Sequence, residues 1–416
     1  MSLIEAYTRF AQNFFPIFFD TFPFWGPPLL GFALFKVWAT YLHYNTLVNV
    51  KDWVLLEIEL PKNITKTPKA MEIVLEGAFF HEDESTWYNQ YVKGDIRTPF
   101  SLEYVSNEGK VHIYVRTDRL FKDTIEAQMY AQYPEIAIHE VEDYVHTVPY
   151  NPDDPNNEYD IWGSELKLSK PDPYPIRTYE HYELEKTGEE EEEKNDPLAS
   201  IFEYLGNLGP GEHCWIQIII RGALGEDDKP YFLGLFGKKG WRTEAKEIVE
   251  GILEGHGHKK PAEGEINVGA LRLSPAEKET IEGIEESLNR MAFETGIRFM
   301  YLAKKTVMTK SRRWPLLNLF HPFEGAGTNF FKMLNPTYIK FPWQDFTGHH
   351  LYEKKYRLWR AYVHRGYFHF PYKRRPMIMT TAELATLFHL PGQVVTTPSL
   401  QRIESKKAEP PANLPV

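Results

Sequence analysis

The sequence predicts an α+β protein in which an N-terminal transmembrane helix is followed by two ferredoxin-like or related α/β sandwich domains. Three observations lead to this fold class: an apolar run near the N-terminus, a βαββαβ order of sequence patterns after it, and a later strand–helix–strand repeat. Apolar residues make up 42% and charged residues 25% of the 416 residues, as in ordinary globular proteins. A chain of this length can build two or three separate cores.

Residues 1–50 are predicted to be a membrane anchor. The run from Phe22 to Tyr44 spans about 23 residues, which is long enough to cross a bilayer with some tilt. Its one charge can reach an interface, and its aromatic residues suit the two interfacial belts. The residues expected to anchor the chain are Trp25, Lys36, Trp38, Tyr41 and Tyr44.

A cleaved signal peptide and a buried core helix are the alternatives to this anchor. A signal peptide needs a basic n-region and a small-residue cleavage site. Here Glu5 balances Arg9, and no Ala-x-Ala follows the apolar run. The predicted localisation is therefore a membrane, with a single-pass N-terminal anchor and the soluble domains on the cytoplasmic side.

Residues 51–145 are predicted to form the first α+β domain. Val54–Leu60 alternates like a strand, and Thr67 can cap a helix that begins at Pro68 and runs to about residue 79. The elements expected after it are the strands Phe100–Val105 and Val111–Arg116, a helix capped by Asp118 that runs to about Gln132, and the strand Ile136–Val141. The order βαββαβ is the ferredoxin-like pattern.

Residues 146–196 are predicted to be an acidic, Pro-rich excursion or linker, part of which could still be a strand of the first domain. The acidic run Glu189–Glu193 is better explained as a solvated loop than as a cation site, because adjacent side chains on one segment cannot converge.

Residues 197–392 are predicted to form a second α+β domain with a basic, aromatic C-terminal part. The expected elements are a helix to about Asn207, the strand Trp215–Arg221, the helix Thr243–Leu253, a helix from the capping box at Ser274 to about Phe293, the strand Ile297–Ala303, and a short amphipathic helix around Leu384. Residues 304–407 hold 18 Lys and Arg against 5 Asp and Glu. Such a surface can face nucleic acid, anionic lipid or an acidic partner, or it can neutralise the acidic remainder of the chain.

Residues 349–375 interleave basic and aromatic side chains. Such a stretch can grip phosphates and stack on single-stranded bases. It also fits a plain amphipathic helix whose aromatic face packs inward, and packing is the preferred interpretation. The possible contacts to nucleic acid or a partner are Lys354, Lys355, Arg357, Trp359, Arg360, Arg365, Lys373, Arg374 and Arg375.

No catalytic, cofactor-binding or metal-binding residue is predicted, and the chain is expected not to be an enzyme. The sequence contains no Gly-x-x-x-x-Gly-Lys-Ser/Thr phosphate loop. The imidazoles of His256 and His258 lie in a Gly/Lys loop without further ligands. His213 and Cys214 are neighbours on a strand, so their side chains point to opposite faces.

Residues 393–416 are predicted to be an extended Pro-rich tail. Pro391-Gly392 stops the preceding helix, and the strip from Thr396 to Pro415 is basic and rich in proline. Its basic residues and prolines include Arg402, Lys406, Lys407, Pro410 and Pro411.

This tail resembles the segment that joins the N-terminal region to the motor domain in type IV secretion (conjugative transfer) ATPases of the HerA/FtsK kind. The resemblance implies that a motor docks on Arg402, Lys406, Lys407, Pro410 and Pro411. The resemblance extends to an uncharacterised bacterial membrane-anchored family whose members precede such ATPases or are fused to them. The stretches that carry it are Pro27–Leu30, Trp53–Pro61, Thr67–Glu72, Gly211–Gln217 and Glu282–Tyr301. The motor domain itself is absent from this sequence.

The resemblance implies a non-enzymatic, membrane-anchored subunit of a type IV secretion-like apparatus for DNA or protein transfer. The chain would serve as the assembly or docking half for a separately encoded HerA/FtsK-type ATPase. The implied partners are that ATPase in trans, the membrane, DNA and further copies of the chain. The alternative is a membrane-tethered module that binds single-stranded nucleic acid.

Overall fold

The computed structural model describes residues 3–61, 66–81, 86–154, 156–182, 184, 196–223, 229–231, 236–238, 240–254, 273–313, 315–325, 327–392 and 402–403. The predicted acidic run at 189–193, the imidazoles at 256 and 258, and most of the predicted tail lie outside these residues.

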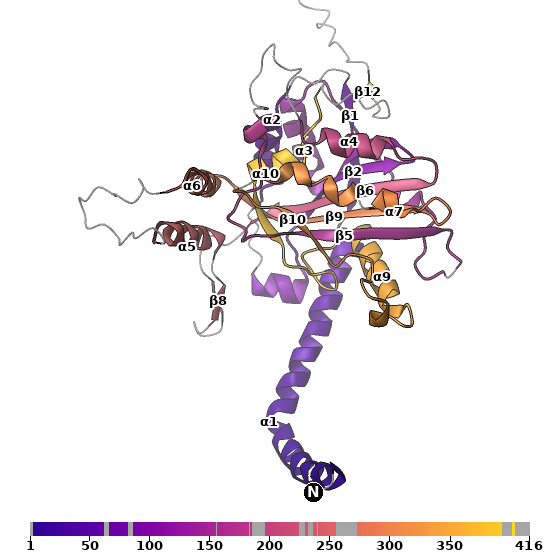
Figure 1. Cartoon of the computed structure of the whole chain (residues 1–416), viewed down its shortest axis with the longest axis vertical. Coiled ribbons are helices and arrows are strands. Elements are labelled where there is room, and N and C mark those ends of the chain that lie inside the picture. The colour runs from indigo at the N-terminus through magenta and orange to yellow at the C-terminus, as the bar shows by residue number, and fades with distance from the viewer. Residues whose placement is uncertain are drawn as a thin grey trace, which may run out of the picture.

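One large sheet runs through the body of the protein (Figure 1). Its strands are β1 (Trp53–Pro61), β2 (Phe100–Asn107), β3 (Lys110–Asp118), β4 (Ala137–Val141), β5 (Tyr159–Leu168), β6 (Glu212–Gly222), β9 (Ala292–Lys304), β10 (Phe331–Leu334), β11 (Met377–Thr380) and β12 (Arg402–Ile403). They lie in the order β10-β5-β9-β6-β2-β3-β1-β12, with β4 beside β1 and β11 beside β9. Only the contact of β12 with β1 is parallel among these described strands. β7 (Lys229–Tyr231) and β8 (Phe236–Lys238) form a separate hairpin.

The strand order of the sheet repeats. The first four strands lie in the spatial order β4-β1-β3-β2, and the strands β5, β6, β9 and β10 lie in the order β10-β5-β9-β6. In both sets the fourth strand lies beside the first, and the third lies between the first and the second, as in an antiparallel βαββαβ unit. The two halves meet at a seam, which is the antiparallel pairing of β2 with β6 from Phe100↔Ile220 to Asn107↔His213.

The expected pair of separate sandwich domains is therefore corrected to one α+β body with a shared sheet. β2 and β6 are buried along almost their whole length. An apolar edge strand leaves a row of backbone N–H and C=O groups without partners, and the seam removes two such edges at once. The near-continuous apolar run Trp215–Ile220 is the pattern of a central strand.

Helices cover the two faces of this sheet (Figure 1). α2 (Pro68–Val74), α3 (Arg119–Gln132), α4 (Ala199–Gly206) and α10 (Thr381–Leu387) lie over one face, whereas α9 (His349–Val363) and the end of α1 lie on the other. Alternate side chains of β1 point to the two faces of the sheet. Val54 and Leu56 belong to the core under the first group of helices, while Leu55 belongs to the core that contains Trp359 of α9.

The remaining described α-helices are α5 (Trp241–Glu254), α6 (Pro275–Leu288), α7 (Lys310–Arg313) and α8 (Pro315–Asn318), and Leu316 of α8 belongs to the core under the first group of helices. The predicted capping box is present at the start of α6, where Ser274 and Glu277 exchange hydrogen bonds. α6 ends at Leu288, before the predicted end at about Phe293, because Phe293 already belongs to β9 and pairs with Met379 of β11.

α1 (Leu3–Asn45) projects from the body and continues as a π-helical turn to Val50 (Figure 1). Within the described ranges, no helix combines the length and the apolar character that crossing a membrane requires. The predicted N-terminal transmembrane helix and single-pass membrane localisation are therefore wrong. The expected span contains Lys36, three prolines, and Trp and Tyr residues, whose amphipathic rings favour an interface over the hydrocarbon core of a bilayer. Part of it contacts the body: Nε1 of Trp38 donates a hydrogen bond to O of Tyr91 at 2.9 Å.

Gly163 in β5 is not expected to tolerate a side chain. A Cβ at this position would clash with the carbonyl oxygen of Phe299 and lie 2.9 Å from Cδ2 of Leu358. We expect Gly163→Ala to lower the free energy of unfolding by about 1–3 kcal/mol, measured by urea denaturation. Gly251→Ala is the matched control, because a Cβ there meets no atom within 4 Å inside α5. This control should raise the free energy of unfolding by about 0.5–1 kcal/mol. Equal stabilities of the two variants would contradict the close approach of β5 to β9.

Candidate functional site: two cationic pockets beside the first helix

The C-terminal half of α1 lies between two pockets of the body. The His369 pocket has a volume of about 470 Å³, and it is lined by residues of α1, the segment 90–97, Arg221 of β6 and the segment 368–373. The Arg360 pocket has a volume of about 810 Å³, and it is lined by α1, α9 and the segment 371–374. Lys36 lines both pockets, so they share one wall.

Two arginines of the His369 pocket share one carboxylate. Nε of Arg221 donates to Oε2 of Glu294 at 2.5 Å, and Nη2 of Arg97 donates to the same oxygen at 3.3 Å. Nη1 of Arg97 also donates to O of Gly222 at 2.7 Å. Burial, followed by the charge of Arg221, lowers the pKa of Arg97 to about 10. Both guanidiniums remain charged near neutral pH, and together they exceed the charge of the carboxylate.

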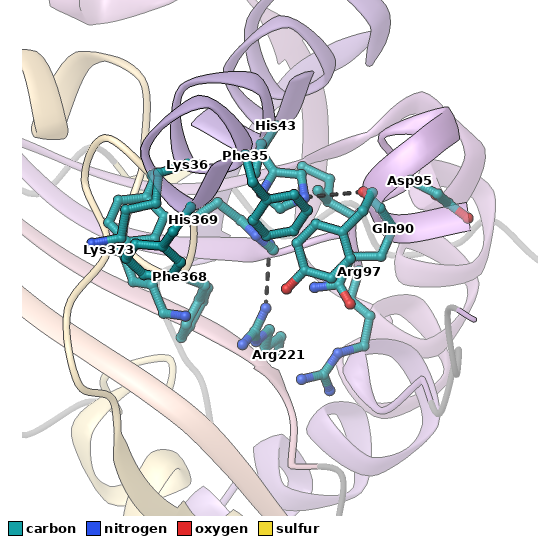
Figure 2. Close-up of a pocket in the computed structure, with 15 residues that line it drawn as sticks. Phe35, Lys36, His43, Gln90, Asp95, Arg97, Arg221, Phe368, His369 and Lys373 are labelled. Carbon is teal, nitrogen blue, oxygen red and sulfur yellow. Dashed lines mark hydrogen bonds between the residues drawn. The ribbon is translucent and has the colours of Figure 1, made fainter. Parts of the chain in front are cut away.

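Two histidines complete the inner part of this pocket (Figure 2). Nη1 of Arg221 lies 3.3 Å from Nε2 of His369, and because a guanidinium only donates, this nitrogen of His369 is the acceptor. The ring of His43 lies 5.2 Å from that of His369, and its Nε2 lies 3.1 Å from O of Gln90. Burial lowers the pKa of both imidazoles, and for His369 the charge of Arg221 lowers it further. The histidines are therefore neutral hydrogen-bonding groups, and the positive charge comes from Arg and Lys.

Lysines and aromatic rings form the outer part of the same pocket. The ammonium groups of Lys36 and Lys373 lie 5.9 and 5.6 Å from the centroid of the Phe370 ring. The rings of Phe35 and Tyr91 lie 5.2 Å apart on the opposite side of the lining. The pocket thus combines a cationic floor with aromatic walls.

The Arg360 pocket has a different composition. Its lining contains four cations, four tyrosines and, among the described residues, no Asp or Glu: the charged and tyrosine residues are Lys36, Tyr41, Tyr44, Tyr356, Arg357, Arg360, Tyr372 and Arg374. The guanidinium of Arg360 lies 6.0 Å from the centroid of the Tyr356 ring. Two of these arginines form ion pairs: Nε of Arg374 lies 2.8 Å from Oε2 of Glu165, and Nε of Arg357 lies 3.2 Å from Oε2 of Glu353.

The body that forms both pockets matches a known protein family. Residues 47–402 match the model of a family described as a domain of unknown function, DUF8128. The chain belongs to this family. No curated protein matches the chain. The matched region includes the whole of the shared sheet except Ile403, whereas the α1 wall of both pockets lies outside it.

The predicted contact residues of the DUF8128 region do not share one surface. Three of them, Arg357, Arg360 and Arg374, line the Arg360 pocket, and Lys373 lines the His369 pocket. The remaining five lie elsewhere. Nζ of Lys354 donates to O of Pro336 at 3.3 Å, and Lys355 pairs with Asp160 at 2.5 Å. Arg375 lies 4.0 Å from Asp172, whereas Trp359 and Arg365 are buried in the interior. The preferred interpretation of inward packing thus describes part of α9, while other basic residues remain on the pocket walls.

The residues predicted as a membrane anchor also have places in the structure. Lys36, Tyr41 and Tyr44 line the Arg360 pocket, and Trp38 is bonded to Tyr91. Nε1 of Trp25 donates to Oγ1 of Thr21 at 3.2 Å within α1. Of the predicted tail residues, Arg402 lies in β12, whereas Lys406, Lys407, Pro410 and Pro411 lie outside the described residues.

Arg365 belongs to a buried ionic network below α9. Its Nε donates to Oε1 of Glu103 at 3.0 Å, and its Nη2 donates to Oδ1 of Asp143 at 2.9 Å. Tyr144 and Gln217 also donate to the carboxylate of Glu103, at 2.7 and 2.9 Å. Burial alone would raise the pKa of Glu103, but the Arg365 guanidinium brings this pKa below its ordinary value. The network connects the segment that follows α9 to β2 and β6, the two strands of the seam.

The described residues offer little for metal or thiol chemistry. No group of three or more His, Cys, Asp and Glu is arranged to hold a metal among them. Cys214 is fully buried in β6, and burial raises the pKa of its thiol, which disfavours the reactive thiolate.

Sequence patterns singled out Lys36 and Lys373 of the His369 pocket, but none of the residues that build its inner part. His43, Arg97, Arg221, Glu294 and His369 come from separate segments, and each has an ordinary local context. The one available signal was Arg221, a charge at the end of a long apolar strand.

Removal of the Arg365 side chain is expected to destabilise the protein strongly. Arg365→Met leaves the carboxylate of Glu103 buried without its cation, and we expect a loss of about 3–5 kcal/mol in the free energy of unfolding. Arg357→Gln is the control, since this exposed arginine pairs with Glu353 on the surface of α9, and its loss should cost at most about 0.5 kcal/mol. Chemical denaturation of both variants measures the difference. A small loss for Arg365→Met would mean that the network does not support the fold.

Proposed function

We propose that this chain is a non-enzymatic docking subunit of a type IV secretion-like transfer apparatus, on which a separately encoded HerA/FtsK-type ATPase assembles. The resemblance of the strip Thr396–Pro415 to the motor-entry segment of those ATPases supports this function. The structural observation behind it is the parallel pairing of β12 with β1, in which Arg402 and Ile403 lie opposite Leu60 and Pro61. This pairing holds one point of the strip on the shared sheet.

The chemistry of the strip suits a docking role. Its prolines favour an extended backbone, which reduces the conformational entropy lost on binding. Its basic residues complement an acidic surface on a motor. An extended segment that follows a sheet edge also uses a common mode of peptide recognition.

Exposed apolar side chains on α1 support an assembly role as well. Phe24, Leu29 and Phe32 are each more than half exposed on this projecting helix. Contiguous exposed apolar surface marks interaction sites more often than free surface. We therefore expect copies of the chain to associate with one another when the apparatus assembles.

Deletion of residues 396–416 is expected to abolish recovery of the ATPase. Native complexes would be purified through the chain, and the HerA/FtsK-type ATPase would be identified by mass spectrometry and by ATP hydrolysis. A second deletion of residues 404–416 keeps β12 and removes only the basic, Pro-rich end. Both deletions should leave the thermal unfolding temperature of the body nearly unchanged, because β12 contributes only two residue pairs to the sheet.

Full ATPase recovery with both deletions would contradict the docking function. A large fall in unfolding temperature with unchanged recovery would instead assign the strip to the body of the same chain.

The Arg360 pocket favours a second candidate function, the binding of single-stranded nucleic acid. Cations and tyrosine rings alternate around this pocket, and Arg360 already lies near the ring of Tyr356. Proteins that bind single strands combine cations for the phosphates with aromatic rings for the bases.

The double variant Arg357→Gln, Arg360→Gln tests this second function. Binding of a fluorescent oligo-dT to the wild-type chain would be measured by anisotropy at several salt concentrations. We expect the double variant to weaken binding about tenfold and to reduce the salt slope by roughly 1.4, because two phosphate contacts are removed. Lys66→Gln, Lys69→Gln is the control, since these exposed lysines lie at α2 on the opposite face of the sheet. Equal effects of the two double variants would exclude the pocket as the binding site.

A further inference from the structure

We propose that the His369 pocket binds a small phosphorylated molecule, with its phosphate held by Arg97, Arg221 and Lys373 and its apolar part held against the aromatic walls. The volume of about 470 Å³ lies in the range of pockets that take small ligands. The three residues that hold the phosphate belong neither to the docking strip nor to the lining of the Arg360 pocket, so the proposal does not depend on either function proposed above.

The balance of charge around this pocket favours an anion. Four cations, Lys36, Arg97, Arg221 and Lys373, line the pocket, and two carboxylates, Asp95 and Glu294, are close to them. Figure 2 shows the Asp95 carboxylate at the margin of the pocket, pointing away from Arg221. Glu294 alone faces the arginines, through one oxygen atom. A bound phosphate dianion would offset the remaining charge.

Both arginines have donors left for such a ligand. A guanidinium carries five N–H donors in a planar fork that matches a phosphate. Arg221 directs Nε to Glu294 and Nη1 to His369, and Arg97 directs Nη1 and Nη2 to Gly222 and Glu294. In the described hydrogen bonds this leaves Nη2 of Arg221 and Nε of Arg97 to reach an oxyanion.

His369 orients the site without adding charge. It accepts a hydrogen bond from Arg221, and burial together with the charges of Arg221, Lys373 and Arg97 lowers its pKa. The imidazole is therefore a neutral acceptor that fixes the plane of the Arg221 guanidinium, which lies 4.2 Å from the centroid of the Phe368 ring.

The arrangement suits a small ligand better than a polymer. The cations line a single pocket, and α1 forms one wall of it (Figure 2). The rings of Phe35, Tyr91 and Phe370 lie around the same pocket and can contact a planar or apolar group. A phosphomonoester with such a group satisfies both features.

Calorimetric titration of the full chain tests the proposal. The probes are pyrophosphate, AMP and adenosine, with oligo-dT as a polymeric source of phosphate. We expect pyrophosphate and AMP to bind, and adenosine, which lacks the phosphate, to bind at least about tenfold more weakly. Absence of binding by both phosphorylated probes would overturn the proposal. Binding of oligo-dT alone would overturn it too, because the site would then belong to nucleic acid.

Three single variants test whether AMP binds in this pocket, because each is expected to change the affinity for AMP in a stated direction. Lys373→Gln removes a cation from the outer wall and should weaken AMP binding about fivefold to tenfold, and Arg221→Lys should weaken it more because the planar fork is lost. Glu294→Gln removes the competing carboxylate and should strengthen AMP binding about fivefold. The double variant Lys66→Gln, Lys69→Gln should leave the affinity unchanged.

Thermal unfolding of each variant separates a loss of binding from a loss of fold. If Arg221→Lys does not fold, Lys373→Gln and Glu294→Gln still decide the question, because they should change the affinity in opposite directions. Weaker AMP binding by a folded Glu294→Gln variant, or equal affinity in all variants, would overturn the assignment.

Discussion

The antiparallel pairing of β2 with β6 is the interaction on which the rest of the structure depends. It runs from Phe100↔Ile220 to Asn107↔His213 and converts two four-stranded halves into one sheet. The main core spans this seam, since it contains residues of β1 in the first half and of β9 in the second. α10 and the residues after it bind to the same region. Oγ1 of Thr381 donates a hydrogen bond to Glu72 of α2, and O of His389 accepts one from the hydroxyl of Tyr104 in β2. The two halves are therefore expected to unfold as one cooperative unit.

Local signals in the sequence predicted most individual elements of this fold. The strands and helices between residues 53 and 143 appear where capping residues, turns and alternation indicate them, because these signals act between residues close in the chain. The seam could not be predicted in the same way. Alternation tells which face of a strand is buried, but it carries no information about which distant strand lies alongside. β5 was left open because it lies within an acidic, Pro-rich stretch, and because its buried positions include Gly163 and Ser164, which carry no apolar signal. In the structure, Thr337 accepts a hydrogen bond from N of Gly163, and O of Leu334 accepts one from Oγ of Ser164.

The site shows a similar limit of sequence reasoning. Residues 349–375 were recognised as a basic, aromatic stretch, and the structure divides its charged residues between pocket walls, ion pairs and the interior. The charges that build the His369 pocket lie at residues 36, 97, 221 and 373, so only the folded sheet and the approach of α1 bring them together. For α1, a count of apolar and aromatic residues could not distinguish rings that face lipid from rings that contact protein. Tyr44 and Trp38 make protein contacts, with the ring of His364 and with O of Tyr91.

The repeated strand order has a consequence for charge in the middle of the molecule. The seam joins the second strand of one half to the second strand of the other in the antiparallel sense, so the halves are related by an approximate two-fold axis perpendicular to the sheet. Near the centre of the seam, Glu103 lies opposite Gln217. A perfectly symmetric protein would place two carboxylates there, and Arg365, which already pairs with Asp143, would then face three acids. With an amide on one side, Arg365 needs to neutralise only one acid at the seam, and Gln217 becomes a donor to it. A departure from internal symmetry at a single position thus allows a charged group to remain at the centre of a fused sheet.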